Sequence, residues 1–214
     1  MNRQPTSKVR RLRRNIVSDF PPSDAYGELS DGVSKVLFTA EEIQQRVFEM
    51  GQEISRDYEG CRPLLVGVLK GVFPFMADLI RNITIPLEVD FMAVASYSME
   101  SRDQGFVRLQ KDLDRPLDGR HVLFVEDVID TGLTLNYLLQ SLKARGPATL
   151  KVCTLFDKPQ RRLIKIPIRY KGFDLPDRFV VGYGLDYREL YRNLPFVGLL
   201  KPAVFQPSQS EPVE

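Results

Sequence analysis

The sequence predicts an α/β fold in which a mostly parallel sheet is flanked by helices. Short, nearly continuous apolar runs occur at residues 64–69, 122–125 and 150–156, as is typical of strands that are buried on both faces. Segments with room for a helix separate these runs. Strands that alternate with helices of about ten residues favour parallel pairing through crossover connections.

The first long helix is predicted to follow residue 38. Thr39 and Glu42 fit a capping box, in which each side chain binds a backbone amide at the start of the helix. The next apolar residues then recur at helical spacing and predict one buried face: Ile43, Val47, Met50 and Ile54.

The later elements follow from the alternation of apolar runs with glycine and proline. Lys70-Gly71 ends the run at residues 64–69, and Gly146-Pro147 ends a helix. A polar stretch at residues 96–104 has no hydrophobic period and predicts a mobile loop. Further expected elements are helices at 75–80 and 134–144 and strands at 87–95 and 179–181.

A chain of 214 residues with 43% hydrophobic content can bury one core. We predict a flexible basic extension over residues 1–35, one domain over residues 36–206 and a flexible tail over residues 207–214. Residues 1–14 carry six basic side chains and no acidic one, and the remainder has a net charge of −4. Such tails sometimes bind nucleic acid, but most are only solvated, so we do not expect a nucleic-acid partner.

Several classes of protein are disfavoured by composition. No apolar run approaches the roughly 20 residues that span a bilayer. No apolar stretch follows the N-terminal basic residues before Pro21, which argues against a secretory signal. Two cysteines are too few for a disulfide framework. We therefore expect a cytoplasmic protein without a membrane partner.

The most informative segment is the junction at residues 122–134, where four apolar residues lead into Glu126-Asp127 and then Asp130. Thr131, Gly132 and Thr134 would present hydroxyls and approachable amides at a helix N-terminus, which is suited to a phosphate. The carboxylates could accept hydrogen bonds from two ribose hydroxyls, directly or through a metal. No Gly-x-x-x-x-Gly-Lys is present, so a ribose 5-phosphate fits better than a triphosphate. Any one of these residues alone would also fit an ordinary strand-to-helix turn.

This junction resembles the signature by which type I phosphoribosyltransferases bind phosphoribosyl pyrophosphate (PRPP), and its flanks are similar to the hypoxanthine-guanine branch of that family. The resemblance extends over about residues 36–205. It implies the type I fold, with a small hood region beside the parallel sheet. Val72 is larger than the residue in many relatives, and the 35-residue extension has no counterpart in the family pattern.

The resemblance implies roles for residues on the PRPP side of the site. Binding of the ribose phosphate is assigned to Glu126, Asp127, Thr131, Gly132, Leu133 and Thr134. Binding of pyrophosphate is assigned to Leu69, Lys70, Gly71, Arg162 and Arg192, with a non-proline cis peptide bond between the first two. Association with Mg²⁺, the expected cofactor, is assigned to Glu126, Asp127 and Asp186.

The resemblance likewise implies roles on the purine side. Lys158 is expected to contact the 6-oxo group, while Phe179 stacks on the base and the Val180 backbone meets its edge. Asp130 is expected to be the general base, and Ser96-Tyr97 to begin the mobile loop that closes over the site.

The implied activity is the Mg²⁺-dependent transfer of phosphoribose from PRPP to hypoxanthine or guanine, giving IMP or GMP and pyrophosphate. The expected partners are these substrates and further copies of the chain in a dimer or tetramer. The alternative is a PRPP-sensing regulatory protein of the same fold that binds nucleic acid, which the basic extension keeps open. A regulator need not retain a purine site, so Asp130, Lys158 and Phe179 favour the enzyme.

Overall fold

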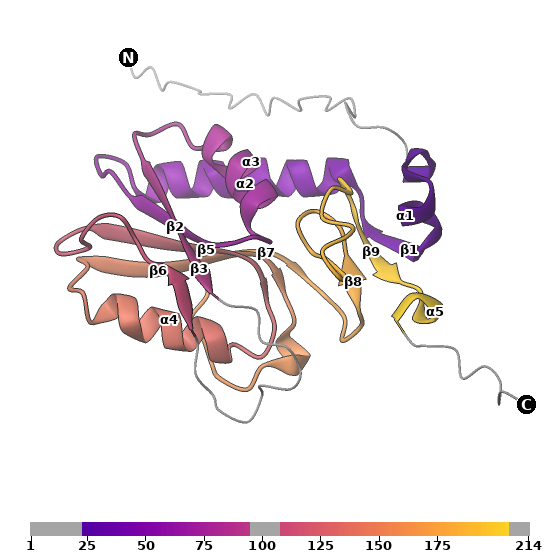
Figure 1. Ribbon diagram of the computed structural model, residues 1–214. Coiled ribbons are helices and arrows are strands. Elements are labelled where there is room, and N and C mark those ends of the chain that lie inside the picture. The colour runs from indigo at the N-terminus through magenta and orange to yellow at the C-terminus, as the bar shows by residue number, and fades with distance from the viewer. Residues whose placement is uncertain (1–22, 95–107, 206–214) are drawn as a thin grey trace, which may run out of the picture.

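The computed structural model describes residues 23–94 and 108–205, and Figure 1 shows a central sheet with helices on both faces. Five strands run parallel, and an edge strand pairs antiparallel with β3. The predicted α/β class is therefore confirmed. The order is β4-β3-β2-β5-β6-β7, with bounds Leu109–Lys111, Glu88–Val94, Leu64–Leu69, His121–Ile129, Thr149–Asp157 and Tyr170–Asp174.

Helices α2 (Ala40–Asp57) and α3 (Phe73–Asn82) cover one face of the sheet, and α4 (Leu133–Lys143) covers the other (Figure 1). Successive strand residues enter different cores because side chains alternate across a strand. Leu65 packs in the cluster with α2 and α3, whereas Leu64 packs in the cluster with α4. In the described part of the chain, no helix is both long and apolar enough to cross a membrane.

The start of α2 confirms the predicted capping box. The backbone amide of Glu42 donates to Thr39 Oγ1 at 3.3 Å, and the Thr39 amide donates to Glu42 Oε2 at 2.8 Å. Removing such a cap typically costs about 1 kcal/mol. The four apolar residues predicted to form one face of this helix are fully buried.

The hood is a second, antiparallel sheet of β1 (Val33–Phe38), β9 (Val197–Leu200) and β8 (Val180–Val181). The strand expected at residues 179–181 therefore belongs to the hood and not to the central sheet. Two-residue β8 is too short to show a pattern from which its sheet could be predicted. Short helices complete the hood: η1 (Ser23–Tyr26), α1 (Glu28–Asp31) and α5 (Pro202–Phe205).

Within the described residues, regular structure is already present at Ser23–Tyr26, before the boundary expected at residue 36. The ring of Tyr26 packs edge-on against Phe196 with centroids 6.2 Å apart. The amide of Lys201 donates to the Gly32 carbonyl at 2.9 Å. The expectation of a flexible extension is thus wrong for residues 23–35. Apolar side chains in this segment pack on the hood although the sequence shows no hydrophobic period there. The rest of the extension and the tail at 207–214 lie outside the described residues.

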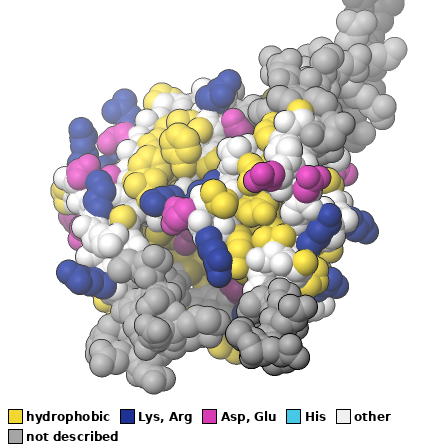
Figure 2. Space-filling model, turned by 45° about the vertical axis from the view of Figure 1, so that its right-hand side comes forward, with side chains coloured by type: hydrophobic (Ala, Val, Ile, Leu, Met, Phe, Trp, Pro, Cys, Tyr) yellow, Lys and Arg dark blue, Asp and Glu magenta, His cyan; other side chains and the backbone are white. Residues whose placement is uncertain are grey.

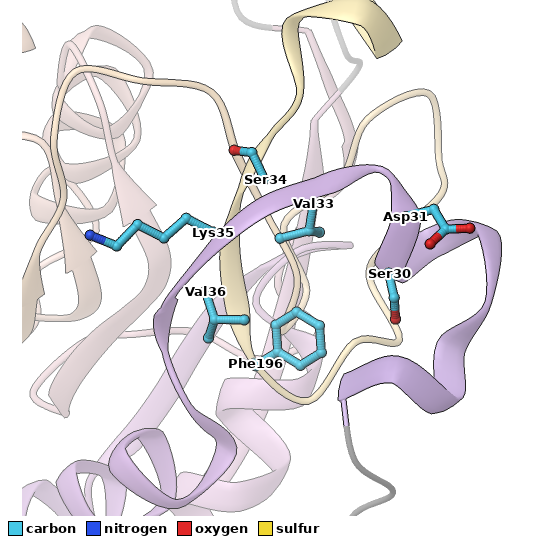
Figure 3. A pocket seen from close by; sticks show the side chains of 7 residues that line it. All are labelled: Ser30, Asp31, Val33, Ser34, Lys35, Val36 and Phe196. Carbon is cyan, nitrogen blue, oxygen red and sulfur yellow. The ribbon is translucent and has the colours of Figure 1, made fainter.

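Figure 3 shows a hollow of the hood between α1 and β1, into which the Phe196 ring projects. It has no residue in common with the predicted site. Figure 2 shows hydrophobic side chains gathered on one face of the molecule among scattered charges. The exposed large hydrophobic residues include Phe73, Leu133 and Phe179, which belong to or adjoin the segments predicted to bind substrate.

Candidate active site

Three segments that are distant in sequence meet at Gly71. A Cβ on Gly71 would lie 1.9 Å from Asp127 Oδ2, so only glycine lets the loop after β2 approach the acidic end of β5. A Cβ on Gly184 would lie 2.1 Å from the Gly71 carbonyl oxygen, and Gly184 has a φ of 95°. The loop after β2, the acidic segment and the hood are therefore in direct contact.

The acidic pair lies on a strand and not on a turn as predicted. Strand β5 continues to Ile129, and Glu126 is paired with Thr154 of β6. The Val128 amide donates to Asp127 Oδ1 at 2.8 Å. Pairing with a neighbouring strand fixes the backbone that carries both carboxylates, so they are held ready for a ligand.

Both carboxylates lie where burial disfavours their ionised forms. Burial raises the pKa of Asp127 to about 6, although backbone amides and the charge of Arg192 oppose the shift. Burial, with the Asp127 charge as a second cause, raises the pKa of Glu126 well above its usual range. A cation at this site would stabilise the ionised forms of both groups.

The phosphate-binding residues predicted around α4 surround its N-terminus. Gly132 is the N-cap residue and is left-handed, with a φ of 82°. No N-cap side chain binds the first amides of the helix, although Thr131 Oγ1 accepts a 3.4 Å hydrogen bond from the Leu133 amide. Leu133 and Thr134 are exposed. Unpaired amides at a helix start suit an anion.

The predicted pyrophosphate loop has the expected backbone. The peptide bond between Leu69 and Lys70 is cis. Lys70 Nζ lies 3.1 Å from Glu189 Oε2 of the hood, and both side chains are largely exposed. An ammonium held this loosely is available to a phosphate group.

Arg192 is the centre of the hood loop. Its Nη1 donates to the Gly184 carbonyl at 2.7 Å, and its Nη2 lies 2.8 Å from Asp186 Oδ1 and 3.5 Å from Glu189 Oε2. Its buried Nε has no partner within the described part of the chain. Asp186 also accepts the Glu189 amide at 3.0 Å through Oδ2. Arg192 thus connects the expected metal-associated carboxylate with the partner of Lys70.

Arg162, predicted to lie near the pyrophosphate, is held by contacts within the protein. Its Nε donates to the Asp130 carbonyl at 3.1 Å, its Nη2 donates to the Ile129 carbonyl at 3.3 Å, and Nη2 also pairs closely with Asp157. The Arg162 and Asp157 side chains are only 14% and 8% exposed. These contacts indicate that Arg162 supports the loop after β5, and its role at the pyrophosphate stays a prediction.

The polar groups expected to face the purine are engaged by protein partners. Arg161 Nε lies 2.5 Å from Asp130 Oδ1. Lys158 Nζ donates to the Arg178 carbonyl at 3.0 Å. Burial lowers the pKa of Lys158, with the charge of Asp130 opposing that effect, so the ammonium and the Asp130 carboxylate influence each other.

The expected stacking residue Phe179 is 41% exposed and has aromatic neighbours on two sides. Its ring stacks with Phe205 of α5 at a centroid distance of 5.4 Å and an angle of 22°, and meets Tyr187 edge-on at 5.5 Å. Val180, predicted beside it, is buried in β8. The hood therefore presents an aromatic ring held in place by other rings.

Sequence reasoning missed four residues of this region: Arg161, Asp177, Glu189 and Phe205. All four act through contacts with residues distant in sequence, and no local pattern marks such contacts. The adjacent pair Arg161-Arg162 was the available signal, but it did not show which arginine faces the site. Ser96 and Tyr97, predicted to begin the closing loop, lie outside the described residues.

The three residues predicted to associate with metal do not form a ready-made ligand cluster. Over residues 23–94 and 108–205, no group of three or more histidine, cysteine or acidic side chains could hold a metal ion by itself. Mg²⁺ commonly takes one or two carboxylates and completes its shell with waters and substrate phosphates. The half-buried carboxylates of Glu126 and Asp127 fit that mode.

Comparison with known proteins agrees with this geometry. A model of the phosphoribosyl transferase domain matches residues 35–188. A hypoxanthine-guanine phosphoribosyltransferase of Bacillus subtilis is 51% identical over 174 residues, which are 81% of this chain and 97% of that protein. A hypoxanthine phosphoribosyltransferase structure from Staphylococcus aureus has a TM-score of 0.80 and 44% identity, with 83% and 97% of the two chains covered. One from Trypanosoma cruzi has a TM-score of 0.77 and 40% identity, with 82% and 95% covered.

The fold and site thus define a phosphoribosyltransferase. The chain belongs to the hypoxanthine-guanine phosphoribosyltransferase family.

Proposed function

We propose that this enzyme transfers phosphoribose from PRPP to hypoxanthine or guanine with Mg²⁺ as cofactor, forming IMP or GMP and releasing pyrophosphate. The observation that carries the proposal is the meeting of the pyrophosphate loop, the acidic strand end and the hood at Gly71. This contact supports a shared site, because the segment predicted to bind pyrophosphate touches the strand end predicted to bind ribose.

The PRPP side would be bound mainly by charge. The amides at the start of α4 would hold the 5-phosphate, and Glu126 and Asp127 would bind the ribose hydroxyls. Lys70 and Arg192 would face the pyrophosphate as negative charge accumulates on it. When bound, Mg²⁺ would neutralise part of that charge and orient the diphosphate. Glu126, Asp127 and Asp186 are the residues that would hold it.

The purine side would supply recognition and proton transfer. As N9 of the base attacks C1 of the ribose and pyrophosphate leaves, the N7 proton must depart, and Asp130 would accept it. Lys158 would donate to the 6-oxo oxygen, while Phe179 would stack on the ring. Adenine carries an amino group in place of that oxygen and would leave Lys158 without an acceptor.

The test is a spectrophotometric assay of hypoxanthine, guanine, xanthine and adenine with PRPP and Mg²⁺. We expect hypoxanthine and guanine to react several orders of magnitude faster than adenine, because a site that loses a hydrogen bond to its substrate rejects it strongly. Adenine turnover equal to that of hypoxanthine would overturn the specificity. No turnover of any purine, together with salt-sensitive binding of RNA, would favour the regulatory alternative.

A further inference from the structure

We propose that Arg161 is a positioning residue that bridges Asp130 and Asp177 in the free enzyme and binds Asp177 alone when a purine is bound. This inference rests on the proposed role of Asp130 as proton acceptor. It concerns a residue outside the sequence signature that led to that role.

The guanidinium of Arg161 bridges the carboxylates of Asp130 and Asp177. Arg161 Nε lies 2.5 Å from Asp130 Oδ1, and its Nη1 lies 3.2 Å from Asp177 Oδ1. The three side chains are 44–50% exposed. A bridge between partly exposed side chains is weak enough to rearrange during each catalytic cycle.

The contact with Arg161 competes with a purine for the Asp130 carboxylate. The guanidinium occupies Oδ1, one of the two carboxylate oxygens that an N–H donor can approach. Withdrawal of Arg161 frees this oxygen for the N7–H of the purine. Binding of the purine therefore exchanges one partner of Asp130 for another.

Asp177 can bind the guanidinium of Arg161 once it has left Asp130. In the free enzyme Asp177 has only the longer of the two contacts, because Nε is used by Asp130. Once Nε is free, the Arg161 fork can bind Asp177 through two parallel hydrogen bonds, which are stronger than one. Asp177 thus stabilises the state in which Arg161 has left Asp130 more than the bridged state.

The groups that would contact the purine and the carboxylate that would bind Arg161 lie on or beside one short segment, residues 177–179. Asp177 is followed by Arg178, whose carbonyl accepts a hydrogen bond from the Lys158 ammonium, and then by Phe179. A purine that engages Lys158 and stacks on Phe179 acts on the same short segment that receives Arg161. Arrival of the base and withdrawal of Arg161 are therefore coupled through residues 177–179.

The test compares Arg161→Gln and Asp177→Asn, which should change the KM for hypoxanthine in opposite directions. Arg161→Gln removes the competing guanidinium, so this KM should fall. Asp177→Asn removes the alternative partner, so it should rise. Exposed ion pairs are typically worth about 0.2–1 kcal/mol, which corresponds to about 1.5- to 5-fold in KM. The effects should fall on the purine KM and not on kcat or on the KM for PRPP, because the contact with Asp130 is absent from the loaded site.

The double variant and a control complete the design. In Arg161→Gln/Asp177→Asn the KM should match that of Arg161→Gln alone, because Asp177 acts only through Arg161. Arg169→Gln removes an equally exposed pair with Asp57 outside the site and should leave every constant unchanged. Changes of the same sign in both single variants, or an Asp177→Asn effect that persists without Arg161, would overturn the inference while purine transfer by the wild-type enzyme still stood. Absence of that transfer would instead refute the proposed function.

Discussion

The loop after β5 and the hood loop at residues 182–192 are each held by one arginine, but the two arginines differ in what else they touch. Arg162 binds two carbonyls of its loop and a buried aspartate, and it is only 14% exposed. Arg192 binds one carbonyl and two carboxylates that are more exposed than Asp157. One of these carboxylates, Glu189, also pairs with Lys70. These contacts indicate that Arg162 supports its own loop, whereas Arg192 connects groups that are predicted to bind substrate. Burial of the partner carboxylate, and not the residue type, separates the two arginines.

The largest effect on turnover is expected for a substitution of Asp130, in the loop after β5. Asp130→Asn keeps the shape of the side chain but cannot accept the N7 proton. General-base assistance is typically worth about 10²–10⁴-fold, so kcat should fall by that factor. The measurement is steady-state turnover of hypoxanthine at saturating PRPP. Near-normal kcat would remove Asp130 as the base and place the chemistry elsewhere.

The support role of Arg162 can be tested through stability. Among the residues that the structure describes, Arg162→Leu leaves the Asp157 carboxylate with only Lys171, whose Nζ is 3.6 Å away. Breaking a buried pair in this way costs about 3–5 kcal/mol in the free energy of unfolding, to be measured by urea denaturation. Adding Asp157→Asn should recover part of the loss, because no unpaired charge then remains. A loss below about 1 kcal/mol, as is usual for surface pairs, would mean that Arg162 is free to bind pyrophosphate.

The same comparison predicts the reverse behaviour for Arg192. Arg192→Gln should raise the KM for PRPP by roughly 10- to 100-fold, because a hydrogen bond to a charged group is worth about 1.5–3 kcal/mol. The free energy of unfolding should change by about 1 kcal/mol or less, since the carboxylate partners keep access to water. Arg145→Gln, which removes a surface pair with Asp112, is the matched control and should alter neither quantity. A destabilisation as large as that of Arg162→Leu would erase the distinction between the two loops.

How far the sequence predicted the molecule depends on how local each signal is. The capping box at Thr39 and the buried face of α2 were predicted because the responsible residues lie within one or two helical turns. The acidic end of β5 was also found, although the strand extends further than its apolar run, since pairing with β6 draws polar residues into it. The hood was only partly predicted, because residues such as Tyr183 and Glu189 adopt positive φ values that no preference of their types indicates.

The same reasoning applies to the predicted site residues. The peptide bond between Leu69 and Lys70 is cis, as expected. Arg161 and Arg162 were separated only by the structure, which turns one toward Asp130 and buries the other beneath the loop. Long-range pairing of side chains decides such cases, and it is not encoded in neighbouring residues.

The smallest effect is expected at the aromatic edge of the hood. Phe205→Ala removes the ring that stacks on Phe179 and lets the latter rotate. Aromatic pairs are worth about 0.5–1.5 kcal/mol beyond their buried area, so the KM for hypoxanthine should rise about 2- to 10-fold. Phe205→Tyr keeps the stack and should behave like the wild type. An unchanged KM in the alanine variant would show that Phe179 is positioned by Tyr187 or by β8 alone.

The most direct test of the division between the two loops is the dissociation constant of PRPP with Mg²⁺, measured by calorimetric titration of Asp130→Asn and Arg192→Gln in parallel. We expect Asp130→Asn to bind PRPP with nearly wild-type affinity despite its low kcat, while Arg192→Gln binds it roughly 10- to 100-fold more weakly. The opposite outcome, with PRPP binding lost in Asp130→Asn and intact in Arg192→Gln, would refute this division. It would mean that the β5 loop binds the substrate through Asp130 and that the hood does not.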